Sequence, residues 1–250
     1  MYMYPFPRHK SLNVGLFLSI FDVENTLSEI TLKLSFILRV AFTFRVSKIY
    51  WINDSPISKK LKKIIMDITK YASTPPYLKK YIPINPNLKK VGMMSPLNLF
   101  SHIVSKLATE GEIRLGYKGD YGISKKLRSP YNSVLITDSV KIEYTPYISI
   151  FYDRINMEFI EFEKIFDLEN IIIASRNGKN PLKNMNEIVD LYKKDGLTLI
   201  IGPPYGHLLE KLGENFLERA YNFAINQGVS DIRAEEALAY SLAILNILLS

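Results

Sequence analysis

The sequence predicts an α/β fold built on a parallel sheet, and three segments near its start indicate this class. Residues 12–20 form a short, nearly continuous apolar run, which is typical of a strand covered on both faces. Residues 26–44 place apolar side chains at spacings of three and four, as in a helix, and residues 46–52 return to strand character. A strand, a helix and a second strand in this order predict two parallel strands joined by a right-handed crossover.

Length and composition bound the class of protein. The 250 residues suffice for one large domain or one domain with a small insertion, and 47% hydrophobic residues can form a sizeable core. Lys and Arg number 32 against 25 Asp and Glu, and the net charge of +7 suits either a polyanionic partner or a solvated basic surface. The absence of cysteine excludes disulfides, thiolate metal sites and cysteine nucleophiles.

No metal site or membrane segment is expected. The three histidines, His9, His102 and His207, show no metal-ligand spacing. The apolar stretches are too short or carry charges, and the first residues lack the apolar core of a signal peptide. We therefore expect a cytoplasmic protein.

Arg39 stands inside the apolar helix that the pattern predicts over residues 26–44. One interpretation is an arginine at the edge of the core, with its stem on apolar surface and its charge in solvent or in an ion pair. The other is an arginine that faces an active site.

Residues 59–90 are strongly basic, with nine lysines and the single acid Asp67. The first part has the amphipathic spacing of a helix, and four prolines then break the segment into turns. Tyr71, Tyr77 and Tyr81 are interleaved with the lysines. The segment is therefore either a solvated face or a surface for single-stranded RNA, which needs both basic and aromatic side chains.

Residues 112–152 change to glycine-punctuated β segments, EIRLGYK, SVLITDSVKIEYT and YISIFYDRI. Short alternating strands with turn signals between them predict a small barrel or sheet. We expect its basic residues to contact RNA phosphates, namely Lys118, Lys125, Lys126 and Arg128.

The α/β pattern resumes after Phe166. It predicts strands over residues 170–174 and 197–201, with a helix over 181–193 between them. Turns at 175–178 and 202–206 follow the two strands, and ligands of open parallel sheets bind just beyond such strand ends. Both turns contain glycine, which lets the backbone approach a ligand closely, so both are candidate cofactor loops.

Residues 226–250 predict a loop that leads into a long helix. Ser230 or Asp231 is the expected N-cap, and Glu235 and Glu236 fall in the first turn, where the helix dipole favours negative charge. Taken alone, this pattern is typical of an ordinary packing helix.

The closing segment of the chain and its basic segment resemble SPOUT-class RNA methyltransferases, in particular the archaeal and eukaryotic RNA uridine-N3 methyltransferase group. Asn226-Gln227-Gly228, followed by Arg233 and Glu235-Glu236-Ala237, resembles the closing segment of that group. TPPYLKKY at 74–81 resembles its TPQYLRK box, and Pro86-Asn87-Leu88, Gly92 and Pro96-Leu97 continue the match. Phe100-Ser101-His102 departs from the group's Pro-His-His triplet, so His102 is either an RNA contact or a loop histidine with no special task.

The resemblance implies a parallel-sheet SPOUT fold with a C-terminal trefoil knot, which general topology rules would not predict. It implies an N-terminal SPOUT part over residues 1–105, an inserted OB-like β-barrel domain over 106–160, and the knotted cofactor-binding part over 161–250. It also implies a homodimer, and the two apolar helices of this chain have more apolar surface than one sheet face covers.

The cofactor implied by the resemblance is S-adenosyl-L-methionine, and the implied substrate is structured RNA such as ribosomal RNA. The cofactor-binding residues would lie in three loops, namely Ala174, Ser175 and Gly178, then Ile201, Gly202 and Gly206, then Ile225, Asn226, Gln227 and Gly228. The RNA-binding residues would be Lys59, Lys60, Lys79, Lys80, His102, Lys125, Lys126 and Arg128.

The related group has an arginine in the place of Arg39, which favours the active-site interpretation. Arg39 or Arg233 would stabilise negative charge on the uracil carbonyls, and Glu235 is either the general base or only a first-turn capping residue. Two rival hypotheses are a non-catalytic RNA-binding module on a degenerate scaffold and a SPOUT-class methyltransferase that acts on protein.

Overall fold

The computed structural model describes residues 4–54, 59–124, 127, 129, 131–148, 150–203 and 212–250. The chain forms two compact units. Unit 1 consists of Met1–Pro7, Lys63–Gly92 and Pro96–Asp153, and unit 2 of Arg8–Lys62, Met93–Ser95 and Arg154–Ser250. The chain thus leaves unit 2 for unit 1 and later returns to complete unit 2.

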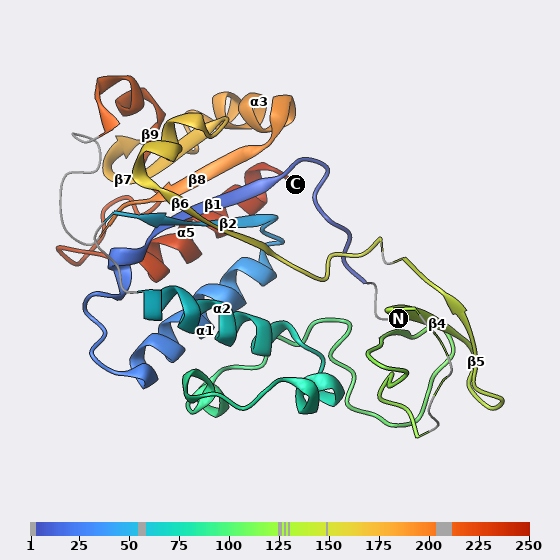
Figure 1. Cartoon of the computed structure of the whole chain (residues 1–250). Helices are drawn as coiled ribbons and strands as arrows, with labels where there is room; N and C mark the ends of the chain where they lie inside the picture. The colour runs from blue at the N-terminus through green and yellow to red at the C-terminus, as the bar shows by residue number, and fades with distance from the viewer. Residues whose placement is uncertain are drawn as a thin grey trace. The chain divides into compact units, whose positions relative to one another are not determined.

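Unit 2 is built on a six-stranded sheet, and the predicted α/β class with a parallel sheet is confirmed (Figure 1). Its strands are β1 (Leu12–Phe17), β2 (Lys48–Asn53), β6 (Asn156–Glu161), β7 (Ile171–Lys179), β8 (Leu197–Ile201) and β9 (Ala220–Tyr221). They lie in the order β6-β2-β1-β8-β7-β9, and every neighbouring pair is parallel. Their carboxyl ends therefore meet at one edge of the sheet.

Helices cover both faces of this sheet. Figure 1 shows α1 (Leu27–Thr43) and α5 (Ala234–Leu248) on one face and α3 (Met185–Asp195) on the other. The inner faces of α1 and α5 contribute fully buried aliphatic side chains, namely Leu34, Ile37, Leu38, Leu238, Leu242 and Leu245. Each such side chain stabilises the fold by about 1.5–3 kcal/mol relative to an exposed one, so the α1–α5 layer is a core of unit 2.

Local signals set the helix ends. At the start of α1, the Thr26 hydroxyl accepts the N–H of Glu29, and the Glu29 carboxylate accepts the N–H of Thr26 at 2.8 Å. After α3, Gly196 has a φ of +88°, and a Cβ there would lie 2.4 Å from the Ser11 Oγ. Both the left-handed backbone and the close approach of Ser11 therefore require glycine at the helix end.

Unit 1 contains a small antiparallel sheet where the sequence predicts a β structure. Its strands are β3 (Ile113–Leu115), β4 (Ser133–Asp138) and β5 (Glu143–Pro146), in the order β3-β4-β5. Tyr121, Leu127, Val134 and Ile136 form its apolar core. Residues 63–73 of α2 (Lys59–Ser73) and the 3-10 turns η2 (Pro76–Tyr81) and η3 (Pro86–Leu88) complete the unit, and the proline-rich segment is turn-rich as predicted.

The strand predicted at YISIFYDRI, residues 147–155, is wrong, because the described residues of this segment form no strand. The Phe151 ring packs against Tyr4 and Phe6 with ring-centroid distances of 5.2 and 5.1 Å. The Tyr152 N–H donates to the Pro5 carbonyl oxygen at 2.8 Å. These contacts with the start of the chain replace a sheet partner, and the strand begins only at Asn156, as β6 of the parallel sheet.

The N-cap predicted at Ser230 or Asp231 is also wrong, because α5 begins at Ala234. The Glu236 carboxylate accepts a hydrogen bond from the Arg233 N–H at 3.1 Å and so gives this backbone donor a partner at the start of the helix. The Gln227 side-chain amide donates to the carbonyl oxygens of Val229 and Ser230 at 2.9 and 3.1 Å. The side chain of Gln227 thereby holds Val229 and Ser230, which follow it, in the loop before α5.

Candidate functional site

The candidate site lies at the carboxyl edge of the unit 2 sheet, where the segment after β1 meets the start of α5. Lys33 of α1 is the residue that joins them. Its ammonium donates to the Ile20 carbonyl oxygen at 2.8 Å and lies 2.5 Å from Glu24 Oε1 and 3.7 Å from Glu235 Oε2. We call Lys33, Glu24 and Glu235 the buried charge cluster.

The charges of the buried charge cluster lie close together and are shielded from solvent. The side chains of Lys33 and Glu235 are only 6% and 11% exposed, so solvent screens their charges weakly. One cation faces two carboxylates, and Glu235 Oε2 accepts no hydrogen bond within the described residues. Most buried acceptor atoms in proteins have a hydrogen-bond donor, so Glu235 Oε2 stands out as a candidate functional atom.

Arg233 and Glu235, two of the three predicted catalytic residues, come together. Arg233 Nη1 lies 3.9 Å from Glu235 Oε1, and the Arg233 side chain is 70% exposed while that of Glu235 is buried. The guanidinium therefore stands on the solvent side of the carboxylate. Arg39, the third, is exposed on α1 between Lys33 and the helix end, and its carbonyl oxygen accepts the Thr43 hydroxyl at 2.8 Å.

Further acidic side chains surround the ends of β1 and β2. The Ser19 hydroxyl donates to Asp54 Oδ2 at 2.5 Å, which fixes the segment after β1 to the end of β2. Burial, and then the neighbouring Asp54 carboxylate, raise the pKa of Asp22. The carboxyl edge of the sheet thus carries more negative than positive side chains at these strand ends.

The turn predicted at residues 175–178 is instead an irregularity within β7, because the strand continues to Lys179. Ala174 and Lys179 both pair with Tyr221 of β9, so the four residues between them stand out of the ladder. A Cβ on Gly178 would lie 2.4 Å from the Tyr221 backbone nitrogen. The close approach of β9 is sufficient to require glycine at position 178. The other two predicted cofactor-binding residues of this segment, Ala174 and Ser175, are half-buried.

The second predicted cofactor loop begins at the end of β8. Ile201 is buried and pairs with Leu16 of β1 and Ala174 of β7. Gly202 follows it and is half-buried, while Gly206 lies outside the described residues.

The third predicted loop, residues 225–228, lies in a segment that is tied to β7. The Arg176 guanidinium donates to the Ser230 carbonyl oxygen at 2.7 Å, and the Asn222 amide donates to the Arg176 carbonyl oxygen at 2.8 Å. Ile225, Asn226 and Gly228 are exposed, and a Cβ on Gly228 would meet no atom within 4 Å. The loop therefore has an ordered base and an open backbone surface, which fits close approach of a ligand.

The predicted RNA-binding residues differ in how available their charges are. Lys59 and Lys60 are exposed on the unit 2 end of α2. In unit 1, Lys79 Nζ lies 4.4 Å from the centre of the Tyr71 ring, and burial lowers its pKa, while Lys80 Nζ lies 2.6 Å from Asp120 Oδ2. Lys125, Lys126 and Arg128 lie outside the described residues.

His102 belongs to unit 1 and is half-buried. Burial, together with the charge of Lys79, lowers the pKa of His102, although its Nε2 lies 3.3 Å from the Ser73 carbonyl oxygen. The ring is therefore neutral at pH 7, and any contact with RNA would be a hydrogen bond without a full positive charge.

The sequence patterns did not predict two cations that are buried in the structure. Lys33 falls on the apolar stripe of α1, next to Leu34. A lysine on an otherwise apolar stripe is the sequence signal that could have indicated a buried charge. Arg114 is fully buried in unit 1, where its guanidinium donates to Glu112 Oε2 at 2.7 Å and to the Ser105 and Leu107 carbonyl oxygens at 3.0 and 3.1 Å. These bonds satisfy its charge, so Arg114 is a structural residue.

A depression of about 250 Å³ lies at the opposite, amino edge of the sheet, lined by Asn13, Asp195, Thr198 and neighbouring residues. Since ligands of parallel sheets bind at the carboxyl edge, we assign the functional site to the buried charge cluster and its loops. Within the described ranges, no group of three or more His, Cys, Asp or Glu side chains is placed to hold a metal ion. No helix in the described part of the chain has the length and apolarity to cross a membrane.

The chain matches a known protein family. The model of a protein family described as "Putative RNA methyltransferase" matches residues 11–150, more than half of the chain. The matched residues include Lys33, Arg39, Lys79 and Lys80. No curated protein matches the chain.

Proposed function

Because the chain belongs to this family of RNA methyltransferases, we propose that it transfers a methyl group from S-adenosyl-L-methionine to N3 of a uridine in structured RNA such as ribosomal RNA. The observation that carries the proposal is the pair Arg233–Glu235 beside Lys33, at the sheet edge where the predicted cofactor loops also end. A buried carboxylate with a free acceptor atom suits removal of the N3 proton.

The open loop surfaces support binding of the cofactor. The backbones at Ala174, Ser175, Ile201, Gly202 and residues 225–228 would hold it, together with Gly206, and the open space over Gly228 leaves room for close approach. When bound, S-adenosyl-L-methionine supplies an electrophilic methyl group. The protein's task is then mostly to align the base with that methyl group and to exclude water.

Each residue of the site has its own role in the proposed reaction. Glu235 accepts the N3 proton, and the neighbouring Lys33 holds its carboxylate in place. Arg233, on the solvent side of Glu235, or Arg39 stabilises the negative charge that develops on the uracil carbonyl oxygens. A neutral donor would stabilise that charge less than a guanidinium.

We also propose the finer features that the SPOUT resemblance implies. The first is a C-terminal trefoil knot. The second is a division into residues 1–105 and 161–250 of the methyltransferase domain, with an OB-like domain over residues 106–160 between them. The third is that the protein is a cytoplasmic homodimer. The parallel sheet followed by a C-terminal helix supports the trefoil knot. Exposed apolar side chains support the dimer, since Leu32 and Phe36 of α1 and Ile247 of α5 are 45%, 45% and 74% exposed.

Two measurements test the function. Calorimetric titration with S-adenosyl-L-methionine separates an enzyme from a non-catalytic RNA-binding module on the same scaffold, because the module takes up no cofactor. Transfer of a labelled methyl group to total RNA and to total protein then separates an RNA methyltransferase from a protein methyltransferase. Label in protein alone would contradict the proposal.

A further inference from the structure

A tight hairpin in unit 1 holds Tyr117 and Lys118 in fixed positions. Tyr117 and Asp120 exchange backbone hydrogen bonds of 3.1 and 3.0 Å. The two residues between them, Lys118 and Gly119, have φ values of +52° and +77°. Positive φ at both central positions is the geometry of a two-residue hairpin turn, so the tip is narrow and ordered.

Asp120 ties this hairpin to the 3-10 turn η2. Its carboxylate accepts the Tyr81 hydroxyl at 3.0 Å and lies 2.6 Å from Lys80 Nζ, and its other oxygen accepts the Gly122 N–H at 2.9 Å. Partial burial opposes ionisation of Asp120, but the hydrogen bonds from Lys80, Gly122 and Tyr81 lower its pKa overall. An ionised Asp120 thus fixes Tyr81 beside Tyr117 at neutral pH.

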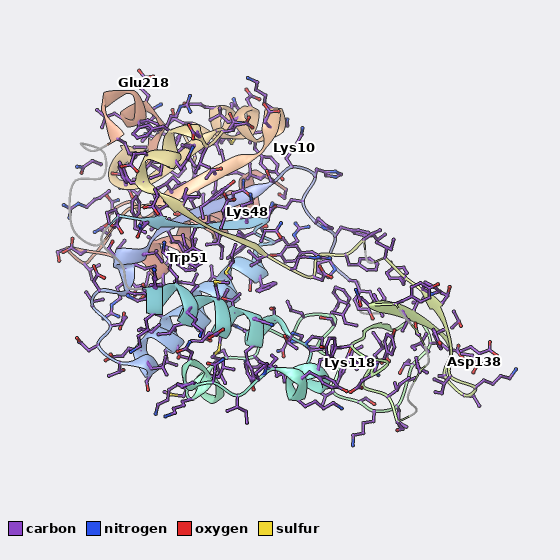
Figure 2. All side chains as sticks on the ribbon, in the orientation of Figure 1. Lys10, Lys48, Trp51, Lys118, Asp138 and Glu218 are labelled. Carbon is purple, nitrogen blue, oxygen red and sulfur yellow. The ribbon has the colours of Figure 1, made fainter. Side chains whose placement is uncertain are left out.

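Tyr81 and Tyr117 form an exposed aromatic pair. Their ring centroids are 5.1 Å apart with an interplanar angle of 64°, and the residues are 41% and 47% exposed. Lys80 Nζ lies 5.3 Å from the Tyr81 ring centre, and Lys118 Nζ lies 5.3 Å from that of Tyr117. Figure 2 labels Lys118 among the side chains of this unit.

We infer that Tyr81, Tyr117, Lys80 and Lys118 form a stacking platform for unpaired bases of an RNA strand. Exposed aromatic faces bind nucleobases by stacking, and neighbouring lysines neutralise the phosphates that follow each base. Bases in an RNA duplex are already stacked on one another and cannot offer their faces. The inference rests on RNA being the substrate, but it is independent of cofactor binding and catalysis.

The platform gives the protein a preference for loops, bulges or single strands. An ordinary solvated face explains the lysines but not two tyrosines held side by side by a carboxylate. The fixed hairpin also lowers the entropic cost of binding, since Tyr117 is already ordered by its turn.

The test measures RNA affinity without cofactor, by fluorescence anisotropy, for a single-stranded oligouridine and for an RNA duplex of equal length. Tyr81→Leu and Tyr117→Leu are each expected to weaken single-strand binding by roughly 5- to 100-fold and to leave duplex binding within about 2-fold of wild type. Tyr117→Phe keeps the ring and should retain affinity. Tyr240→Leu, a control at a tyrosine in unit 2 with 45% exposure, should change neither affinity.

Equal losses on both RNAs would overturn the platform in favour of a purely electrostatic surface, and no loss would show that the tyrosines only pack on each other. Circular dichroism shows whether each variant is folded, and if one leucine variant is unfolded, the other still tests the platform. Lys118→Ala should lower the magnitude of the slope of log RNA affinity against log salt concentration by about one, which corresponds to the loss of one phosphate contact. Lys141→Ala, in another turn of unit 1, is its matched control. Normal methylation with failed stacking, or the reverse, separates this inference from the proposed function.

Discussion

The Lys33 ammonium of α1 lies 3.7 Å from the Glu235 carboxylate of α5, and this contact joins two helices from opposite ends of the chain. A carboxylate buried without such a cation would be expensive to ionise. The ion pair therefore offsets part of the cost of burying the Glu235 carboxylate.

Lys33→Met should lower the free energy of unfolding by about 3–5 kcal/mol, because it leaves Glu24 and Glu235 buried without their cation. The loss, measured by urea denaturation, should shrink as the pH falls, since protonation of a carboxylate removes the uncompensated charge. Lys33→Arg keeps the charge and should cost less. Equal stability of the Met variant and wild type would show that the pair contributes nothing.

Glu235→Gln should slow methyl transfer by roughly 10²- to 10⁴-fold, as expected for loss of a general base, and leave cofactor affinity unchanged. The matched control is Glu236→Ala in the same helix turn. It removes the acceptor of the Arg233 N–H and should cost about 1 kcal/mol of stability without changing the rate per folded molecule. Similar rates in both variants would leave Glu235 as a helix-start residue only.

Arg39→Ala and Arg233→Ala distinguish the two candidates for stabilising charge on the uracil. Loss of the functional guanidinium should raise the activation free energy by roughly 2–4 kcal/mol in single-turnover methylation and barely alter cofactor affinity. If Arg39 only packs along the exposed side of α1, its variant should methylate normally and Arg233→Ala should be slow. Normal rates in both would remove a guanidinium from the mechanism.

The two loop glycines should respond differently. Gly178→Ala places a Cβ against the Tyr221 backbone and should lower the free energy of unfolding by roughly 1–3 kcal/mol. Gly228→Val meets only open space in the free protein, so it should leave the melting temperature unchanged and abolish cofactor binding by calorimetry. Unchanged cofactor affinity would remove Gly228 from the site.

Phe36→Glu should convert the proposed dimer into a monomer, because it places a charge on the exposed apolar side of α1. Analytical ultracentrifugation at micromolar concentration measures the change. Met66→Glu, at a residue of α2 that is 55% exposed, should leave the dimer intact. A monomeric wild-type protein would contradict the dimer itself.

Periodicity predicted the elements of unit 2 because each strand and helix there buries a regular apolar face. The β8 prediction agrees at both ends, and α1 differs from the predicted helix by one residue at each end; at its start, Thr26 is the N-cap and forms a capping box with Glu29. Where contacts between distant residues decide the local structure, the sequence signal failed. The segment around Phe151 is held by Tyr4 and Phe6, and Ser230 is held in the loop by the Arg176 guanidinium, which donates to its carbonyl oxygen.

The candidate site was only partly predictable for the same reason. Arg233 and Glu235 are two residues apart, so their proximity follows from the local chain. Lys33 and Glu235 meet only because α1 and α5 pack on the same face of the sheet, which no local pattern contains. Gly178 was predicted to bind the cofactor, and the close backbone of β9 is a second reason for glycine at this position that no local pattern contains.

Mass spectrometry of nucleosides from RNA incubated with the protein and labelled S-adenosyl-L-methionine tests the central claim most directly. We predict labelled N3-methyluridine with the wild-type protein and with Glu236→Ala, and little or none with Glu235→Gln. Label on a different nucleoside, or equal labelling by the Glu235→Gln and wild-type proteins, would contradict the proposed role of the buried charge cluster.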